Sequence, residues 1–304
     1  MSVDVVLIAG PTASGKSRAA LELAQALGGT IINADSMQVY AELRVLTARP
    51  SAADEAIAPH RLYGHVAAHE RYSVGRYQEE AAAALAEARA HARIAIFVGG
   101  TGLYFDVLTK GLSPIPAVPA EVRANTRLRF ESLGREAFFA ELASRDPATA
   151  AKLRASDTQR ILRAMDVLES SGLPLSHWQR MSGKPVLDGL RVARVVLAPA
   201  REVLNAPIEQ RFEMMVEAGA LEEAAALRGL DPTLPAAKAL GLSQLQRHLA
   251  GEITLQTAIA EAQVATKRYA KRQMTWFRNR MRDWNWRETT DLSNIIALAV
   301  GNIA

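Results

Sequence analysis

The chain has 304 residues, of which 49% are hydrophobic and 22% are charged, and its formal net charge at pH 7 is +4. These values exclude a disordered or fibrous chain and indicate a folded protein with about two domains. No apolar stretch approaches the roughly 20 residues of a membrane span, and no leader pattern precedes the first expected strand, so we expect a cytoplasmic protein with no membrane association. The lack of cysteine excludes disulfides, thiolate nucleophiles and cysteine-bound zinc.

Strand and helix patterns alternate over the first 110 residues. A continuous apolar run predicts a buried strand at 5–9, and a helix is expected at 16–27 after a glycine-rich turn. A second strand is expected at 30–34, a helix with apolar spacing over 77–88, and a third strand at 94–98. This alternation is typical of a parallel sheet flanked by helices, so the predicted fold class is α/β.

A different pattern interrupts this alternation. Prolines punctuate residues 111–119, and the pattern then stays helical to about residue 185. Residues 194–198 predict one more strand, with only helices expected after it. We therefore expect a core domain formed by residues 1–115 and 189–304, with an all-helical insertion domain at 116–188.

The most specific motif lies between the first strand and the first helix. It reads Gly10-Pro11-Thr12-Ala13-Ser14-Gly15-Lys16-Ser17 and fits G-x-x-x-x-G-K-[ST] in full. In such a loop the backbone N–H groups and the helix dipole face phosphate oxygens, Lys16 adds a charge, and the Ser17 hydroxyl can ligate Mg²⁺. The alternative is a glycine turn that only closes the strand and helix. The complete motif favours a site for a diphosphate or triphosphate, without naming the molecule attached.

Two further segments follow strands at the same expected edge of the sheet. Asp35 ends the second strand, where a carboxylate can hold Mg²⁺, accept a proton from a nucleophile, or only cap a following helix. Ser36 and Gln38 are close enough in sequence to share its pocket. Thr101, in the glycine turn 99–102, can offer a hydroxyl to the same cavity, although tight turn packing explains the glycines equally well. No apolar run ending in aspartate follows the third strand, which argues against a motor ATPase.

Basic residues gather near the end of the chain. The segment 267–282 contains seven of them and no acidic residue, with Tyr269, Trp276 and Phe277 interleaved. An apolar seam beside a stripe of one charge favours polyanion binding over an ordinary solvated helix. Arg211, on an earlier helix, could clamp a phosphate, with a solvated arginine as the alternative.

Taken together, these segments resemble the bacterial tRNA dimethylallyltransferases of the tRNA isopentenyl transferase family. The resemblance spans nearly the whole chain and rests on residues 10–17, 33–40, 58–62, 98–104, 157–164 and 270–277. It implies a P-loop NTPase-like fold. It also implies transfer of a dimethylallyl group from dimethylallyl diphosphate to N6 of the adenosine just after the anticodon of tRNA. The phosphate loop would hold the diphosphate, with Mg²⁺, where other P-loop proteins hold ATP.

The same resemblance implies roles for individual residues. Asp35 would take the proton from N6, and Thr101 would bind the leaving diphosphate or its bridging oxygen. Lys16, Ser17 and Arg211 would neutralise the leaving group. The helical insertion would close over the anticodon stem-loop of tRNA, and a monomer is expected. The tRNA-binding residues would be Asp35, Ser36, Met37, Gln38, Thr101, Arg123, Gln159, Arg160, Ile161, Leu162, Arg163, Lys271, Arg272, Gln273, Trp276 and Arg278.

Two segments depart from the family pattern. Leu46-Thr47-Ala48-Arg49-Pro50 stands where the family commonly has Gly-Thr-x-Lys-Pro, and Leu242 replaces an aromatic residue. We assign no catalytic role to either segment. Two other functions stay open: a small-molecule kinase that uses ATP at the same loop, with Asp35 activating a hydroxyl, and a nucleotide-regulated RNA-binding module without transfer chemistry.

Overall fold

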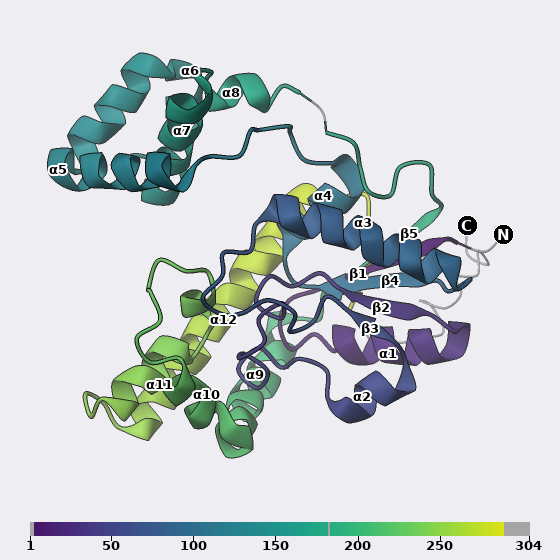
Figure 1. Cartoon of the computed structure of the whole chain (residues 1–304). Coiled ribbons are helices and arrows are strands. Elements are labelled where there is room, and N and C mark those ends of the chain that lie inside the picture. Colours follow the sequence, from purple (N-terminus) through teal and green to yellow (C-terminus); the bar gives the residue numbers. More distant parts are fainter. Residues whose placement is uncertain (1–2, 182, 289–304) are drawn as a thin grey trace. The chain divides into compact units, whose positions relative to one another are not determined.

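The computed structural model describes residues 3–181 and 183–288 (Figure 1). The chain divides into two compact units, Met1–Thr109 with Val186–Ala304 as unit 1 and Lys110–Pro185 as unit 2. The elements of unit 1 are β1 (Val5–Ala9), α1 (Lys16–Leu27), β2 (Thr30–Asn33), α2 (Ala52–Ile57), β3 (His60–Arg61), α3 (Val74–Ala90), β4 (Ala95–Gly99), α4 (Gly102–Lys110), β5 (Val192–Leu197), α9 (Arg201–Met215), η1 (Val216–Ala220), α10 (Leu221–Ala226), η2 (Ala236–Lys238), α11 (Leu242–Leu249), α12 (Leu255–Arg280) and β6 (Asn285–Arg287).

Unit 1 is built on a parallel sheet. Its strands run in the order β3-β2-β4-β1-β5-β6 over the described residues, and every pairing is parallel. The predicted α/β fold class, with a P-loop NTPase-like sheet flanked by helices, is confirmed. Because parallel strands all end at one edge, the segments that follow β1, β2 and β4 meet there. The motifs singled out in the sequence therefore lie at the carboxyl ends of the strands.

Helices cover both faces of the sheet because successive side chains of a strand point to opposite sides. Val5 and Leu7 of β1 belong to the buried cluster on the face covered by α3. Val6 and Ile8 belong to the cluster on the other face, which α1 covers. Figure 1 shows α1 and α3 on opposite sides of the strands. The continuous apolar run at 5–9 thus reflects a strand buried on both faces.

Two of the described strands escaped the sequence analysis: the two-residue β3, and β6, which follows the strand at 194–198 where only helices were expected. Asn285–Arg287 forms β6 and pairs in parallel with β5, with Val195 opposite Asn285. The segment is short, polar and half-buried, so it lacks the apolar pattern of an interior strand. It lies at the edge of the sheet, where only one side is paired. Residues 289–304, where the expected helices would continue, lie outside the described residues.

Unit 2 contains α5 (Ala120–Arg145), α6 (Pro147–Ala150), α7 (Thr158–Ser171) and α8 (Leu175–Trp178). Phe138 and Leu142 of α5 pack with Ile161 and Met165 of α7 in its core. Gly134, at φ 76°, breaks α5 into two helical parts. The unit therefore has its own hydrophobic core.

The last helices of unit 1 complete the site. Leu204 and Ile208 of α9 pack against Ala270 of α12, and Ala13 of the phosphate loop joins this cluster. The contact brings α9 and α12 to the loop that follows β1. No helix in the described part of the chain is long and apolar enough to cross a bilayer.

Candidate active site

The phosphate loop has the backbone conformation that its glycines suggest. Gly15 lies at φ 79° and Ala13 at φ 62°, and α1 begins at Lys16. The Lys16 ammonium donates a hydrogen bond to the Pro11 carbonyl at 3.2 Å. The Ser14 hydroxyl is buried and has no hydrogen-bond partner among the described residues. A buried, unpaired hydroxyl beside a helix N-terminus suits a ligand with phosphate oxygens.

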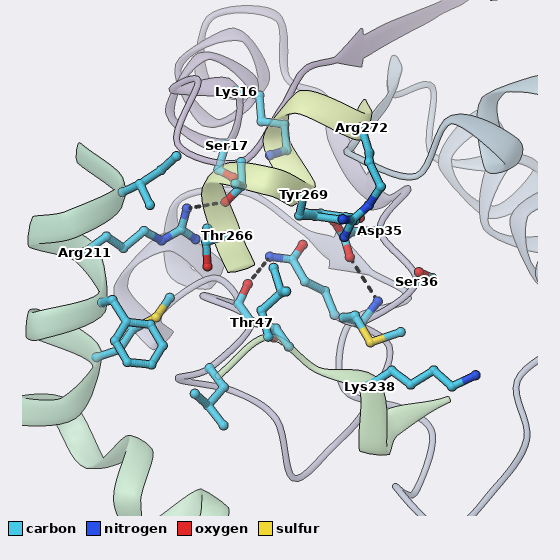
Figure 2. Close-up of a pocket in the computed structure, with 18 residues that line it drawn as sticks. Lys16, Ser17, Asp35, Ser36, Thr47, Arg211, Lys238, Thr266, Tyr269 and Arg272 are labelled. Atoms are coloured by element: carbon cyan, nitrogen blue, oxygen red, sulfur yellow. Dashed lines mark hydrogen bonds between the residues drawn. The ribbon is translucent and has the colours of Figure 1, made fainter. Parts of the chain in front are cut away.

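A cavity of about 300 Å³ opens beside this loop. The segments after β1 and β2 form part of its wall, and α9, α12 and the segment before α11 form the rest (Figure 2). In Figure 2, Arg211 points from α9 toward the phosphate loop, while Asp35 lies near Tyr269 and Arg272. The lining residues are Thr12, Lys16, Ser17, Asp35, Ser36, Met37, Gln38, Leu46, Thr47, Ile208, Arg211, Phe212, Met215, Lys238, Leu240, Thr266, Tyr269 and Arg272.

Asp35 is held rigidly where β2 ends. Its N–H donates to Asn33 Oδ1 at 2.8 Å, and Asn33 Nδ2 donates to the Asp35 carbonyl at 2.9 Å. Asp35 Oδ1 accepts a hydrogen bond from the Met37 N–H at 2.9 Å. Residues 36–39 form bends and turns rather than a helix, so the helix-cap alternative is excluded. The Asp35 carboxylate lines the cavity instead.

The turn after β4 packs closely on the end of β2. A Cβ on Gly99 would overlap the Ala34 backbone, and one on Gly100 would overlap the Gln273 amide and lie 3.3 Å from Asp35 Oδ2. Only glycine fits these positions without displacing its neighbours. Tight packing therefore explains the glycines, and the same packing brings the next residue to the site.

Thr101 and Ser36 bridge the two strand ends. The Thr101 hydroxyl accepts the Ser36 N–H at 2.9 Å and donates to the Ser36 hydroxyl at 3.2 Å. Ser36 follows Asp35 directly and lines the cavity. Thr101 thus lies next to the residues that border the carboxylate.

Gln273 belongs to the interior of the site. Its side-chain oxygen accepts the Thr12 N–H at 3.0 Å, and its amide group donates to the Gly100 carbonyl at 3.0 Å. The residue is 5% exposed. We therefore correct its expected tRNA contact: a buried side chain bonded to both loops has no surface for RNA and instead positions the phosphate loop against the turn after β4.

Two cations lie at the phosphate-loop end of the cavity. Burial lowers the pKa of Lys16 to about 8; nearby Asp35 opposes this shift and Arg211 adds to it. Burial also lowers the pKa of Arg211, which the Asp35 charge partly offsets. Arg211 donates to the Thr12 hydroxyl at 3.5 Å, so it is not a solvated helix arginine. Burial is the main cause of both shifts, and an anion bound beside these cations would oppose them.

Tyr269 of α12 lies on the other side of the cavity. Burial raises the pKa of its phenol, and the charge of Asp35 raises it further. The phenol therefore stays neutral near pH 7 and can donate a hydrogen bond. The Arg272 guanidinium lies 5.6 Å from the centre of the Tyr269 ring and also lines the cavity.

The basic segment of α12 is divided among different surroundings. Lys267 pairs with Glu209 and Arg280 with Asp106, so these two cations already have carboxylate partners. Lys271 and Arg278 line a separate crevice of about 200 Å³ between α9 and α12. The basic residues of α12 therefore do not form one continuous surface for a polyanion. Lys271 and Arg278 stay candidates for that role.

Trp276 packs against the start of α4. A Cβ on Gly102 would overlap its indole ring. The indole N–H is buried and has no hydrogen-bond partner in the described ranges.

The expected tRNA-binding residues of unit 2 differ in exposure. Arg123, Gln159, Arg160 and Arg163 are exposed, and Leu162 is half-buried. Ile161 is fully buried in the unit's core, so its expected contact with tRNA is corrected: its side chain packs α7 and has no surface for RNA.

Several cavity residues were missed by the sequence analysis. They are Ile208, Phe212, Met215, Lys238, Leu240 and Thr266. Their local sequence gives no signal, because only the packing of α9, α12 and the loop before α11 brings them to the phosphate loop. Leu46 and Thr47 also line the cavity, and the departure of Leu46 from the family pattern was the one available sign.

The fold and the site define a P-loop α/β protein whose phosphate loop shares a cavity with an ordered carboxylate. A family model described as IPP transferase matches residues 38–280, and one described as isopentenyl transferase matches residues 3–70. The chain belongs to the IPP transferase family.

Individual relatives match along most of their length. A tRNA dimethylallyltransferase of Rhodopseudomonas palustris is 56% identical over 283 residues, which is 92% of this chain and 88% of the relative. One of Azorhizobium caulinodans is 54% identical over 92% of this chain and 90% of its own. The structure of the Bacillus halodurans tRNA isopentenylpyrophosphate transferase matches with a TM-score of 0.67 and 30% identity. The match covers 98% of this chain and 97% of that structure's chain. The structure of a eukaryotic dimethylallyltransferase acting on tRNA matches with a TM-score of 0.81 and 25% identity. The match covers 99% of this chain and 79% of that structure's chain.

Proposed function

We propose that the chain is a tRNA dimethylallyltransferase. It transfers the dimethylallyl group of dimethylallyl diphosphate to N6 of the adenosine on the 3′ side of the anticodon and releases diphosphate. The observation that carries this proposal is one cavity lined by both the phosphate loop and Asp35. The similarity to tRNA dimethylallyltransferases over 92% of the chain supports it.

Asp35 is the proposed base. The adenine amine is a weak nucleophile because its lone pair is delocalised into the ring, so a proton must leave as the new N–C bond forms. The hydrogen bonds from Asn33 and Met37 fix the Asp35 backbone and one carboxylate oxygen. An oriented carboxylate can accept that proton without reorganising during the reaction.

The leaving diphosphate is the proposed ligand of the phosphate loop, residues 10–17. Negative charge grows on its bridging oxygen as the C1–O bond breaks. Lys16 and Arg211, which are partly buried and line the cavity, stabilise this charge. Thr101 is proposed to bind the same group; its hydroxyl, which here donates to the Ser36 hydroxyl at 3.2 Å, would turn toward the diphosphate when that ligand is bound.

The residues present fit Mg²⁺ as a cofactor. Ser17 and Asp35 offer oxygen ligands on the cavity wall, and the described residues contain no cluster of three or more metal-ligating side chains. Mg²⁺ commonly binds through one or two protein oxygens, substrate phosphates and water. We propose Ser17 as its protein ligand; when bound, the ion neutralises diphosphate charge.

The proposed partner is the anticodon stem-loop of tRNA. Its adenine must leave the base stack at a cost of about a few kcal/mol, and side chains must receive the flipped base. We propose Asp35 to Gln38 and Thr101 for this, with Arg272 and Trp276 from α12. Exposed Arg123, Gln159, Arg160 and Arg163 hold the splayed loop in this proposal, together with Leu162. We also propose that residues 116–188 form the tRNA-binding insertion. The protein is proposed to be a monomer that acts in the cytoplasm.

Labelled substrates test the function directly. Purified protein, unmodified tRNA, Mg²⁺ and labelled dimethylallyl diphosphate should give labelled RNA. A product mass equal to one added dimethylallyl group on the anticodon fragment identifies the reaction. Label arriving from γ-labelled ATP would instead support the kinase, and RNA binding without transfer would support the binding module.

Affinity for dimethylallyl diphosphate should fall with rising pH. Because burial lowers the pKa of Lys16 to about 8, the ammonium loses its proton above that pH while the diphosphate stays ionised. We expect the dissociation constant to rise about tenfold between pH 8 and pH 9.5, measured by calorimetry. Lys16→Arg keeps its charge over this range and should give a flatter curve; a flat wild-type curve would contradict the assignment.

Removal of the crevice cations should weaken tRNA binding. Lys271 and Arg278 line the crevice between α9 and α12 and form no ion pair with any described residue. Lys271→Ala with Arg278→Ala should reduce the slope of log affinity against log salt by about 1 to 2. Arg89→Ala with Arg93→Ala removes the same charge before β4, at the opposite edge of the sheet, and serves as the control. Equal slopes for both double variants would contradict the prediction.

A further inference from the structure

The cavity has two ends of different chemistry. Lys16, Ser17 and Arg211 form the polar end at the phosphate loop, whereas Leu46, Phe212, Met215 and Leu240 contribute apolar wall. Thr47, the neighbour of Leu46, lies on the side of the cavity away from Lys16 (Figure 2). An allylic diphosphate has the same division, with a charged group at one end and hydrocarbon at the other.

Backbone hydrogen bonds hold the loop that carries Leu46 in place. The N–H groups of Val45 and Leu46 donate to the two carboxylate oxygens of Glu223, at 2.6 and 3.0 Å. The Gln38 amide donates to the carbonyls of Thr47 and Ala48 at 2.9 and 3.0 Å. The loop is therefore attached both to α10 and to the segment after Asp35.

The Leu46 side chain is packed tightly in this wall. It is 6% exposed and belongs to the same hydrophobic cluster as Phe212. A Cβ on Gly241 would lie 2.5 Å from the Phe212 ring and 3.3 Å from Leu46 Cδ2. Interiors packed at this density do not accept added atoms without strain. The Leu46 side chain therefore fills space at this point of the cavity wall.

We propose that Leu46 limits the length of the prenyl chain that the cavity accepts. This inference rests on the proposed function. With the diphosphate at Lys16 and Arg211, and C1 beside Asp35, the hydrocarbon extends along the apolar wall. Dimethylallyl ends there, whereas geranyl carries one further isoprene unit that would overlap the Leu46 side chain. Leu46 thus selects the shorter allylic diphosphate by excluded volume.

The test compares two donors. Leu46→Ala removes the γ and δ carbons and should raise the ratio of kcat/KM for geranyl diphosphate over dimethylallyl diphosphate at least about tenfold, since one methylene alone changes selectivity by about 10 to 200-fold. Transfer to tRNA is measured for both donors, and the product mass identifies the attached chain. If Leu46→Ala does not fold, Met215→Ala opens the same wall at a half-buried position, and the same rise in the ratio is expected.

Leu227→Ala is the matched control. Leu227 is 7% exposed, belongs to the same hydrophobic cluster as Leu46 and does not line the cavity, so its truncation loosens the core without enlarging the site. Its donor ratio should equal that of the wild type. A folded Leu46→Ala variant that transfers dimethylallyl with the wild-type ratio would overturn this inference alone. A wild-type enzyme that transfers from neither donor would overturn the proposed function and this inference with it.

Discussion

Asp35→Asn is expected to lower kcat for dimethylallyl transfer by about 10² to 10⁴-fold. The substitution keeps an oxygen that can accept the Met37 N–H, so the turn after β2 should stay in place. It removes the basic oxygen that accepts the N6 proton. Single-turnover transfer to tRNA measures the chemical step, and tRNA affinity, measured separately, should stay within about twofold of the wild type.

Asp283→Asn is the control for Asp35→Asn. Asp283 is exposed and pairs with Arg194 away from the cavity, so the same change of atoms there should leave transfer unaltered. Wild-type turnover in Asp35→Asn would remove Asp35 as the base. Loss of tRNA affinity equal to the loss of kcat would mean that Asp35 acts only by binding tRNA and not as the base.

Lys16→Ala is expected to lower kcat/KM for dimethylallyl diphosphate by about 10² to 10³-fold. The ammonium lies at the start of α1 and lines the cavity beside Arg211. Its loss removes stabilisation of the bound and the leaving diphosphate. Steady-state kinetics with varied donor gives this effect, whereas tRNA affinity reports whether the RNA site stays intact.

Arg18→Ala controls for the loss of one positive charge near the start of α1. Arg18 is exposed and pairs with Glu22, and it does not line the cavity. Its kinetics should match those of the wild type. If Lys16→Ala and Arg18→Ala gave the same kcat/KM, the effect would be one of net charge and not of diphosphate binding.

The amino-acid sequence by itself determined the sheet core and the phosphate site. The run at 5–9 consists only of apolar residues, so burial on both faces follows from its composition. The residues of the motif at 10–17 determine its backbone conformation locally, because glycine readily adopts the positive φ at Gly15 and the helix begins at the next residue. Such signals are local, and neighbours in sequence are enough to read them.

Only the tertiary structure decided which distant residues complete the cavity. Gln273 looked like an RNA contact because it lies in a basic segment, yet the packing of α12 buries it between Thr12 and Gly100. β6 forms because an edge of β5 is available, which three polar and aromatic residues cannot signal. The loop that carries Leu46 is held at the cavity wall by hydrogen bonds to Glu223, a residue far along the chain. These contacts depend on long-range packing, whose geometry a one-dimensional pattern of hydrophobic and charged residues does not contain.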